Sequence, residues 1–207
     1  MKVLIINGSP HKAGCTSVAL KELENTLNLE GIDTEYVYVG STNIRGCIGC
    51  GTCRKTMECS FDDIVNKIAK KFEQADGLVV GTPVYYAGAS GTVVSLLDRL
   101  FYSTSFSKVM KVGAAVISSR RAGSTSAFDE INKYFTIAGM PIVSSTYWNE
   151  IHGSKKSDAL NDLEGLQTMR NLGKNMAFLI KSIKLGEKEY EIPTMEREYR
   201  TSFIDNL

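Results

Sequence analysis

The chain alternates short apolar runs with longer amphipathic segments. The first run, VLIIN at residues 3–7, is continuously apolar and ends in Gly-Ser-Pro, which is typical of a strand buried on both faces of a sheet. Similar reasoning predicts further strands over residues 35–39, 77–81 and 112–117, with a fifth beginning over residues 141–145.

Between these strands, apolar side chains recur every three or four residues. The first helix is expected to begin with Thr16 as its N-cap and to bury Leu20, Leu23 and Leu27. Four more helices are predicted over residues 62–74, 90–102, 124–138 and 158–183. Five strands separated by helices predict an α/β protein of three layers, in which a five-stranded parallel sheet is covered by helices on both faces. We expect the doubly wound order 2-1-3-4-5, the arrangement in which the loops considered below would meet.

The composition is that of one ordinary globular domain. The chain has 207 residues, of which 43% are hydrophobic and 23% are charged. We expect residues 1–185 to form the domain and residues 186–207 a C-terminal arm. Lys and Arg number 24 against 23 Asp and Glu, so no basic surface for a nucleic acid is expected. The apolar start of the chain is too short for a signal peptide or a membrane span, and a cytoplasmic location is predicted.

Four of the five cysteines lie within thirteen residues, in a loop (residues 45–60) inserted after the second strand. Their spacing is C-x2-C-x2-C-x5-C, and a loop of this kind can wrap one compact inorganic centre. A [4Fe–4S] cluster is one interpretation, with zinc, a redox disulfide and an empty loop as alternatives. The candidate ligands are Cys47, Cys50, Cys53 and Cys59.

The segment after the first strand, GSPHKAGCTS at residues 8–17, has the features of a phosphate site. Its glycines allow the backbone to approach a ligand, and its hydroxyl and basic side chains add donors. Because it opens a helix, free N–H groups and the helix dipole also face it. The segment matches neither the dinucleotide fingerprint nor the P-loop motif.

Two further loops carry candidate binding residues. TPVYYAGASG, at residues 82–91, offers two tyrosine rings to a planar ligand, and SSRRAGS, at residues 118–124, offers two arginines to an anionic one. The loops after strands 1, 3 and 4 of such a sheet meet at its carboxyl edge, and together they suit FMN better than ATP or NAD. The predicted FMN-binding residues are Ser9, His11, Lys12, Gly14, Cys15, Thr16, Ser17, Pro83, Val84, Tyr85, Tyr86, Ala87, Gly88, Ser118, Arg120, Arg121 and Gly123.

Three segments resemble the flavodoxin-like NAD(P)H-dependent FMN reductases, and within them the iron–sulfur flavoproteins. They are INGSPHKAGCTS, CIGCGTCRKTMEC and ADGLVVGTPVYYAGASGTVVSLLDRL, which together span about half of the chain. Many relatives have arginine and asparagine where this chain has His11 and Cys15. The resemblance implies bound FMN, hydride transfer from NAD(P)H to the flavin, and electron transfer onward through a [4Fe–4S] cluster. No separate acid–base or nucleophilic catalyst is expected.

Two other functions fit the same residues. One is an electron carrier that accepts single electrons from ferredoxin, and the other is a metal or redox sensor that works through the cysteine loop.

We also predict a homodimer or homotetramer, because one domain was not expected to cover the helix face that carries Val94, Leu97 and Phe101. The polar arm carries four large side chains that could be ordered by packing, against a neighbouring subunit for example: Tyr190, Ile192, Tyr199 and Phe203.

Overall fold

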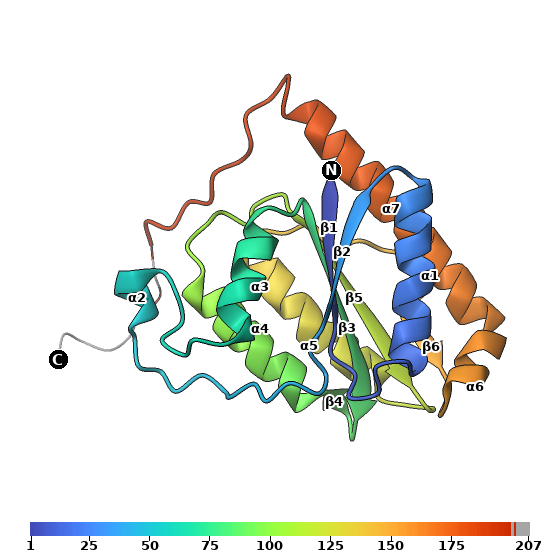
Figure 1. The fold of residues 1–207 in the computed structure, drawn as a ribbon. Helices are drawn as coiled ribbons and strands as arrows, with labels where there is room; N and C mark the ends of the chain where they lie inside the picture. The colour runs from blue at the N-terminus through green and yellow to red at the C-terminus, as the bar shows by residue number, and fades with distance from the viewer. Residues whose placement is uncertain (200, 202–207) are drawn as a thin grey trace.

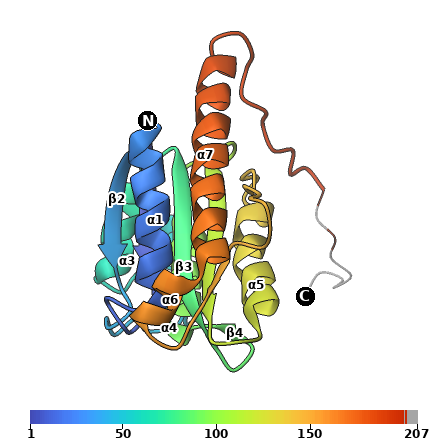
Figure 2. The ribbon, with the colours of Figure 1, turned by 90° about the vertical axis from the view of Figure 1, so that its right-hand side faces the viewer.

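A parallel sheet lies between two layers of helices (Figures 1 and 2). The computed structural model describes residues 1–199 and 201; the prediction for Phe203 lies outside them. The strands are β1 (Lys2–Asn7), β2 (Asp33–Tyr38), β3 (Gly77–Tyr85), β4 (Gly88–Ala89), β5 (Val112–Ser119) and β6 (Glu150–His152). The helices are α1 (Cys15–Leu29), α2 (Cys53–Thr56), α3 (Ile64–Glu73), α4 (Gly91–Ser103), α5 (Ser124–Ile137), α6 (Lys156–Asn161) and α7 (Leu163–Gly186).

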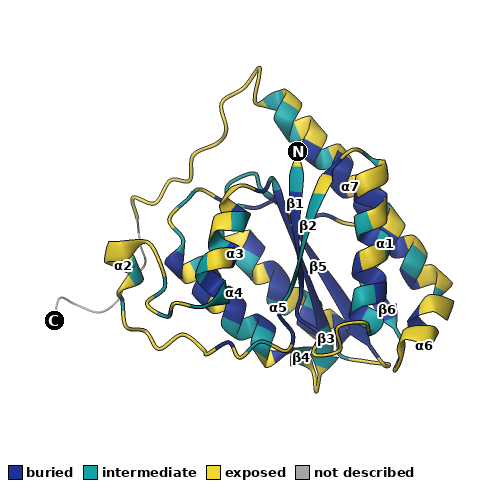
Figure 3. Ribbon diagram, in the orientation of Figure 1, coloured by how far each residue is buried: buried dark blue, intermediate teal, exposed yellow. Residues whose placement is uncertain are grey.

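The predicted fold class is confirmed. The strand order is β2-β1-β3-β5-β6, every neighbouring pair on this path is parallel, and the short β4 pairs with β3 in the antiparallel sense. Counting only the parallel strands, this is the expected order 2-1-3-4-5. The three central strands read as apolar runs because both of their faces are buried, as the dark blue strands of Figure 3 show.

Two hydrophobic cores flank the sheet. Side chains of α1, α6 and α7 pack on one face, around residues such as Leu23 and Met176. Side chains of α3, α4 and α5 pack on the other, around residues such as Phe72 and Leu97. Because these five strands are parallel, their carboxyl ends all point to the same edge of the molecule, which lies at the bottom of Figure 1.

Three predicted elements differ from the structure. The fifth strand is Glu150–His152, and the predicted residues 141–145 contribute only the isolated bridge from Ile142 to Gly113. The last helix is divided at Asp162, whose carboxylate accepts from the N–H of Gly165 and so begins α7. The third strand runs on past residue 81 to Tyr85, because Thr82 and Pro83 still pair with β5 and the two residues after them pair with β4.

The prediction that Thr16 caps α1 is wrong. Gly14 occupies the N-cap position, the helix begins at Cys15, and no side chain caps it. Thr16 lies inside the first turn and is buried. Its hydroxyl contacts Ser118 of β5, as described below.

The α4 face that was expected to need a partner is largely covered within the chain. Leu97 is fully buried, and the Phe101 ring lies 5.8 Å from the Phe72 ring and 5.5 Å from the Tyr134 ring, centroid to centroid. This face therefore does not support the predicted oligomer, which stays a prediction.

The C-terminal arm leaves α7 and passes over the end of α5. Its described residues form no helix or strand, and most of them are exposed. Met195 of the arm lies beside Gly139, which follows α5. Among the residues that the structure describes, no helix is long and apolar enough to cross a membrane.

Candidate functional site

Three loops meet at the carboxyl edge of the sheet. The N–H of Gly8, just after β1, donates to the carbonyl of Gly81 in β3 at 2.9 Å. The Ser90 hydroxyl, which precedes α4, donates to the carbonyl of Gly8 at 3.2 Å. The hydroxyls of Thr16 and Ser118 lie 2.7 Å apart and tie the start of α1 to the end of β5.

Hydrogen bonds within the loop between β1 and α1, and from the ends of β1 and β2, fix the path of this loop. The side-chain oxygen of Asn7 accepts from the N–H of Ser9, and the Ser9 hydroxyl accepts from the N–H of His11. The Tyr38 hydroxyl, at the end of β2, donates to the carbonyl of Pro10 at 2.9 Å. Gly40 lies so close to Ser9 that a Cβ on it would be 1.8 Å from the Ser9 carbonyl oxygen.

The first turn of α1 presents unpaired N–H groups. Among the described hydrogen bonds, none is donated by the backbone N–H of Cys15, Thr16 or Ser17. These are the groups that a helix leaves free at its start, where its dipole favours an anion. The side chains of His11 and Lys12 are exposed beside them. The arrangement can bind a phosphate group through the backbone, with positive charge nearby.

The Cys15 thiol is turned away from this turn. It donates to the carbonyls of Gly153 at 3.4 Å and Lys155 at 3.3 Å. Burial, and then the charge of Asp158, raise the pKa of the thiol, so it stays protonated at neutral pH. Only the backbone of Cys15 is available to a ligand.

The predicted ring loop is a β-hairpin. Tyr86 lies at its tip with φ of 57° and is fully exposed, and Tyr85 is about half exposed. The hairpin is supported from α5, because the Glu130 carboxylate accepts from the N–H of Ala89 at 2.9 Å. The other predicted members, Pro83, Val84, Ala87 and Gly88, all lie in this hairpin, which extends the carboxyl edge of the sheet.

The end of β5 and the loop that follows contribute the third side. Ser118 is buried by its contact with Thr16, whereas Arg120 and Arg121 are exposed. Gly123 has a φ of 88°, which favours glycine, and it lies against Val84 of the hairpin. The three loops are thus in mutual contact, as the sequence predicted.

The sequence reasoning missed four residues of this edge. Asn7, Tyr38 and Gly40 hold the phosphate loop from outside it, and they come from strand ends that no local motif marks. Ser119 was also missed, although its hydroxyl is buried at the end of β5 with no hydrogen-bond partner among the described residues. Its place after an apolar strand was the available signal.

The four clustered cysteines line one small pocket of about 30 Å³ at the other end of α4. Gly49 and Gly51 take positive φ values of 66° and 70°, which lets the chain wind around Cys50. Arg99, Tyr102 and Ser103 of α4 form the opposite side of the pocket. Apart from partly covered Cys53 and Cys59, the loop is mainly exposed, as the region around α2 in Figure 3 shows.

The cysteine loop leaves the carboxyl edge and then follows α4. Gly46 lies near Ser95, and the carbonyl of Arg45 accepts from Arg99. The cysteine loop therefore starts at the same edge as the three loops, but its cysteines lie beside the last residues of α4. From Ser90 to Arg99 the chain rises about 13.5 Å along the helix axis, at 1.5 Å per residue.

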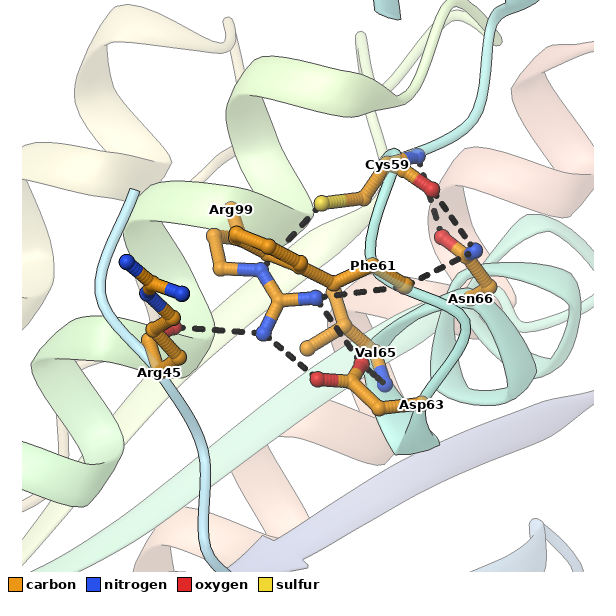
Figure 4. Close-up of polar contacts among 7 residues, drawn as sticks. All are labelled: Arg45, Cys59, Phe61, Asp63, Val65, Asn66 and Arg99. Carbon is orange, nitrogen blue, oxygen red and sulfur yellow. Dashed lines mark hydrogen bonds and ion pairs between the residues drawn. The ribbon is translucent and has the colours of Figure 1, made fainter. Parts of the chain in front are cut away.

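The thiols differ in their surroundings. Hydrogen bonds, first from the Ser60 hydroxyl and then from Thr52, lower the pKa of the Cys50 thiol to about 7, so much of it is thiolate at neutral pH. Cys59 is held most firmly: the Asn66 side chain binds both its N–H and its carbonyl, and Arg99 donates to its sulfur at 3.2 Å (Figure 4). Within residues 1–199 and 201, no three His, Cys, Asp or Glu side chains stand in a metal-coordinating arrangement.

The strand order and the crossover helices on both faces define a doubly wound α/β protein with flavodoxin-like topology. The sequence profile of the NADPH-dependent FMN reductase family matches residues 1–154, and the chain belongs to that family. An NADPH-dependent FMN reductase of Escherichia coli is 33% identical over 101 residues, which are 48% of each chain.

Longer matches are to proteins named for iron and sulfur. An iron-sulfur flavoprotein of Methanocaldococcus jannaschii is 36% identical over 192 residues, covering 89% of this chain and all of that protein. One of Methanosarcina thermophila is 30% identical over 189 residues, covering 89% and 97%. A flavodoxin structure from the domain Archaea is 18% identical with a TM-score of 0.60, covering 87% of this chain and 99% of that one, which shows the flavodoxin-like fold.

Proposed function

We propose that this chain is an FMN-dependent oxidoreductase that takes a hydride from NAD(P)H and passes electrons on through a [4Fe–4S] cluster held by its cysteine loop. Bound FMN would supply the chemistry, accepting two electrons as a hydride and releasing them one at a time. The observation that carries the proposal is the edge at which three loops meet, with free N–H groups on one loop and exposed tyrosines on another.

The residues at this edge would divide the binding of FMN between them. The N–H groups of Cys15, Thr16 and Ser17 would hold the phosphate, with the charge of Lys12 beside it. Ser9, His11 and Gly14 set the path of the loop, since Ser9 accepts from His11 and Gly14 donates to the His11 carbonyl.

The ring of the flavin would lie against the hairpin. Tyr85 would cover one part of it, and the backbone of residues 83–88 would offer polar contacts to its edge. Arg120 and Arg121 are exposed at the rim, where they suit the phosphates of NAD(P)H as it approaches.

The cysteine pocket fits a sulfur-ligated centre by the chemistry of its donors. Four thiols border one pocket, and two donors of α4 lie beside them. One is the buried Arg99, and the other is the buried Ser103 hydroxyl, which has no hydrogen-bond partner among the described residues. With about 30 Å³ the pocket has room for a water molecule or two, so the exposed part of the loop must open to admit the centre. The two matched iron-sulfur flavoproteins support the proposal by their names.

The experiment is an anaerobic reduction of the purified, reconstituted protein. The flavin released from a denatured sample is first identified by mass, and NADH, NADPH or reduced ferredoxin is then mixed with the native protein while the flavin absorbance is followed. Released FMN and rapid bleaching by NADH or NADPH are expected. Bleaching by ferredoxin alone would instead favour the electron carrier, and failure to bind any flavin would contradict the proposal.

A further inference from the structure

Arg99 is the most deeply buried charged side chain among the described residues, and it lies under the cysteine pocket. Only 1% of its surface is exposed. Its guanidinium makes two bonds to the Asp63 carboxylate, at 2.7 and 2.9 Å, and also reaches the carbonyls of Arg45 and Phe61 (Figure 4). Burial of a charge is costly unless it is paired and hydrogen-bonded, and here every side of the guanidinium has a partner.

One N–H group of Arg99 donates to sulfur instead of oxygen. Its Nε–H points at the sulfur of Cys59, 3.2 Å away. The paired Asp63 fixes the plane of the guanidinium, and Asn66 fixes the backbone of Cys59 on the other side, so both partners are set before any ligand arrives. Hydrogen bonds from charged donors are about twice as strong as neutral ones.

Ser103 supplies an independent observation one helical turn further along α4. Its hydroxyl is buried and has no hydrogen-bond partner among the described residues, although a free buried hydroxyl is destabilising. Residues four apart share one face of a helix, and both Arg99 and Ser103 line the pocket of the four cysteines. The unpaired donor is explained if an acceptor occupies that pocket.

We propose that Arg99 and Ser103 are the hydrogen-bond donors by which α4 positions and tunes a sulfur-ligated centre in the cysteine pocket. The inference rests on the proposed function, and it adds two positioning residues that are not ligands. Arg99 holds the Cys59 sulfur at its place in the ligand set, and Ser103 donates to a sulfur atom of the centre. Outer donors of this kind orient ligands and shift reduction potentials.

The expected shift has a definite sign. On one-electron reduction the centre gains a negative charge, and a donor to sulfur stabilises this reduced form more than the oxidised one. Removing the donor therefore lowers the midpoint potential. Loss of one hydrogen bond to a charged group changes the equilibrium about tenfold, which is about 59 mV for a one-electron couple.

The test compares four proteins: wild type, Ser103→Ala, Arg99→Lys and, as the matched control, Ser105→Ala, whose exposed serine lies outside the cysteine pocket. Each is reconstituted anaerobically with iron and sulfide and titrated with dithionite while its paramagnetic resonance spectrum is recorded. The thermal unfolding of each apoprotein is measured separately, so that a folding defect is distinguished from a change at the centre.

We expect Ser103→Ala to take up as much iron as wild type and to unfold at the same or a higher temperature. Its midpoint potential should be lower by about 59 mV, which corresponds to a tenfold change in the equilibrium constant for reduction. Arg99→Lys keeps the charge without the planar fork, and it should lower both iron content and potential. Equal potentials in Ser103→Ala and Ser105→Ala would overturn the inference while leaving the proposed function standing. Absence of iron from the wild type would overturn both.

Discussion

Gly40 offers a sharp test of the phosphate loop, because it touches the loop without belonging to it. A Cβ at this position would lie 1.8 Å from the carbonyl oxygen of Ser9, 2.2 Å from its carbonyl carbon and 2.8 Å from the nitrogen of Pro10. All three are backbone atoms, so no side-chain rotation can relieve the contact. In Gly40→Ala the separation from the Ser9 oxygen must grow by at least 1.2 Å to reach 3.0 Å.

The displacement has two expected effects. Overpacking of this kind costs about 1–3 kcal/mol of folding free energy. The shifted Ser9 also disturbs the turn that leads to the free N–H groups of Cys15, Thr16 and Ser17, and hydrogen bonds to an anion weaken steeply with poor geometry. We therefore expect FMN affinity to fall about 10-fold to 100-fold, or about 1.4–2.8 kcal/mol.

The apoprotein is titrated with FMN, and binding is measured from the quenching of flavin fluorescence. Thermal unfolding of the apoprotein is measured separately. Gly186→Ala is the matched control, since a Cβ at the end of α7 would meet nothing within 4 Å. Tyr38→Phe is a milder change at the same loop, because it removes only the hydrogen bond to the Pro10 carbonyl. An FMN affinity in Gly40→Ala equal to that of Gly186→Ala would refute the reasoning.

Three other predictions follow from single contacts. Thr16→Ala should lower the unfolding free energy of the apoprotein by about 1 kcal/mol, because it leaves the buried Ser118 hydroxyl unpaired, and Thr16→Ser should restore it; equal denaturant midpoints would contradict this. Cys50→Ala should abolish iron uptake on anaerobic reconstitution, whereas Cys15→Ala should not, as measured by iron assay. Burial alone would raise the pKa of Asp63, but the bonds from Arg99 hold that pKa below its ordinary value. The stability contributed by the ionised Asp63 is therefore complete above about pH 4 and is lost as the pH falls further. Asp63→Asn should be less stable than wild type at pH 7, and its stability should depend less on pH in an acid titration monitored by circular dichroism.

The sequence predicted the sheet well because its central strands are apolar on both faces. The runs at β1, β3 and β5 stand out for that reason, and the amphipathic segments between them indicate the helical crossovers that parallel strands need. The strand order came instead from the doubly wound arrangement in which the binding loops would meet. The edge strand β6 was misplaced because only three of its residues pair, and Tyr147 and Trp148 before it are exposed, so no buried pattern marks it.

The candidate site was predictable in its loops and not in its supports. Glycines, hydroxyls and tyrosines in one segment reveal a binding loop, but the contacts of Tyr38 and Gly40 depend on distant strand ends meeting in space. Thr16 was predicted as a cap from its residue type, but Gly14 occupies the N-cap position, and the Thr16 hydroxyl contacts Ser118 of a distant strand instead. The sequence analysis did not single out Arg99, because its burial and its contact with Cys59 depend on segments that meet only in the fold.

The central claim is that one chain joins a hydride-accepting flavin to a one-electron centre. The most direct measurement is anaerobic mixing of the reconstituted protein with NADPH and, separately, NADH, while the flavin absorbance is recorded and samples are frozen for paramagnetic resonance. The account predicts one FMN and about four irons per chain, bleaching of the flavin by at least one nicotinamide, and a resonance signal from the reduced centre that Cys50→Ala lacks. Bleaching of the flavin with no iron and no such signal in the wild type would contradict it and leave a flavin reductase with an empty cysteine loop.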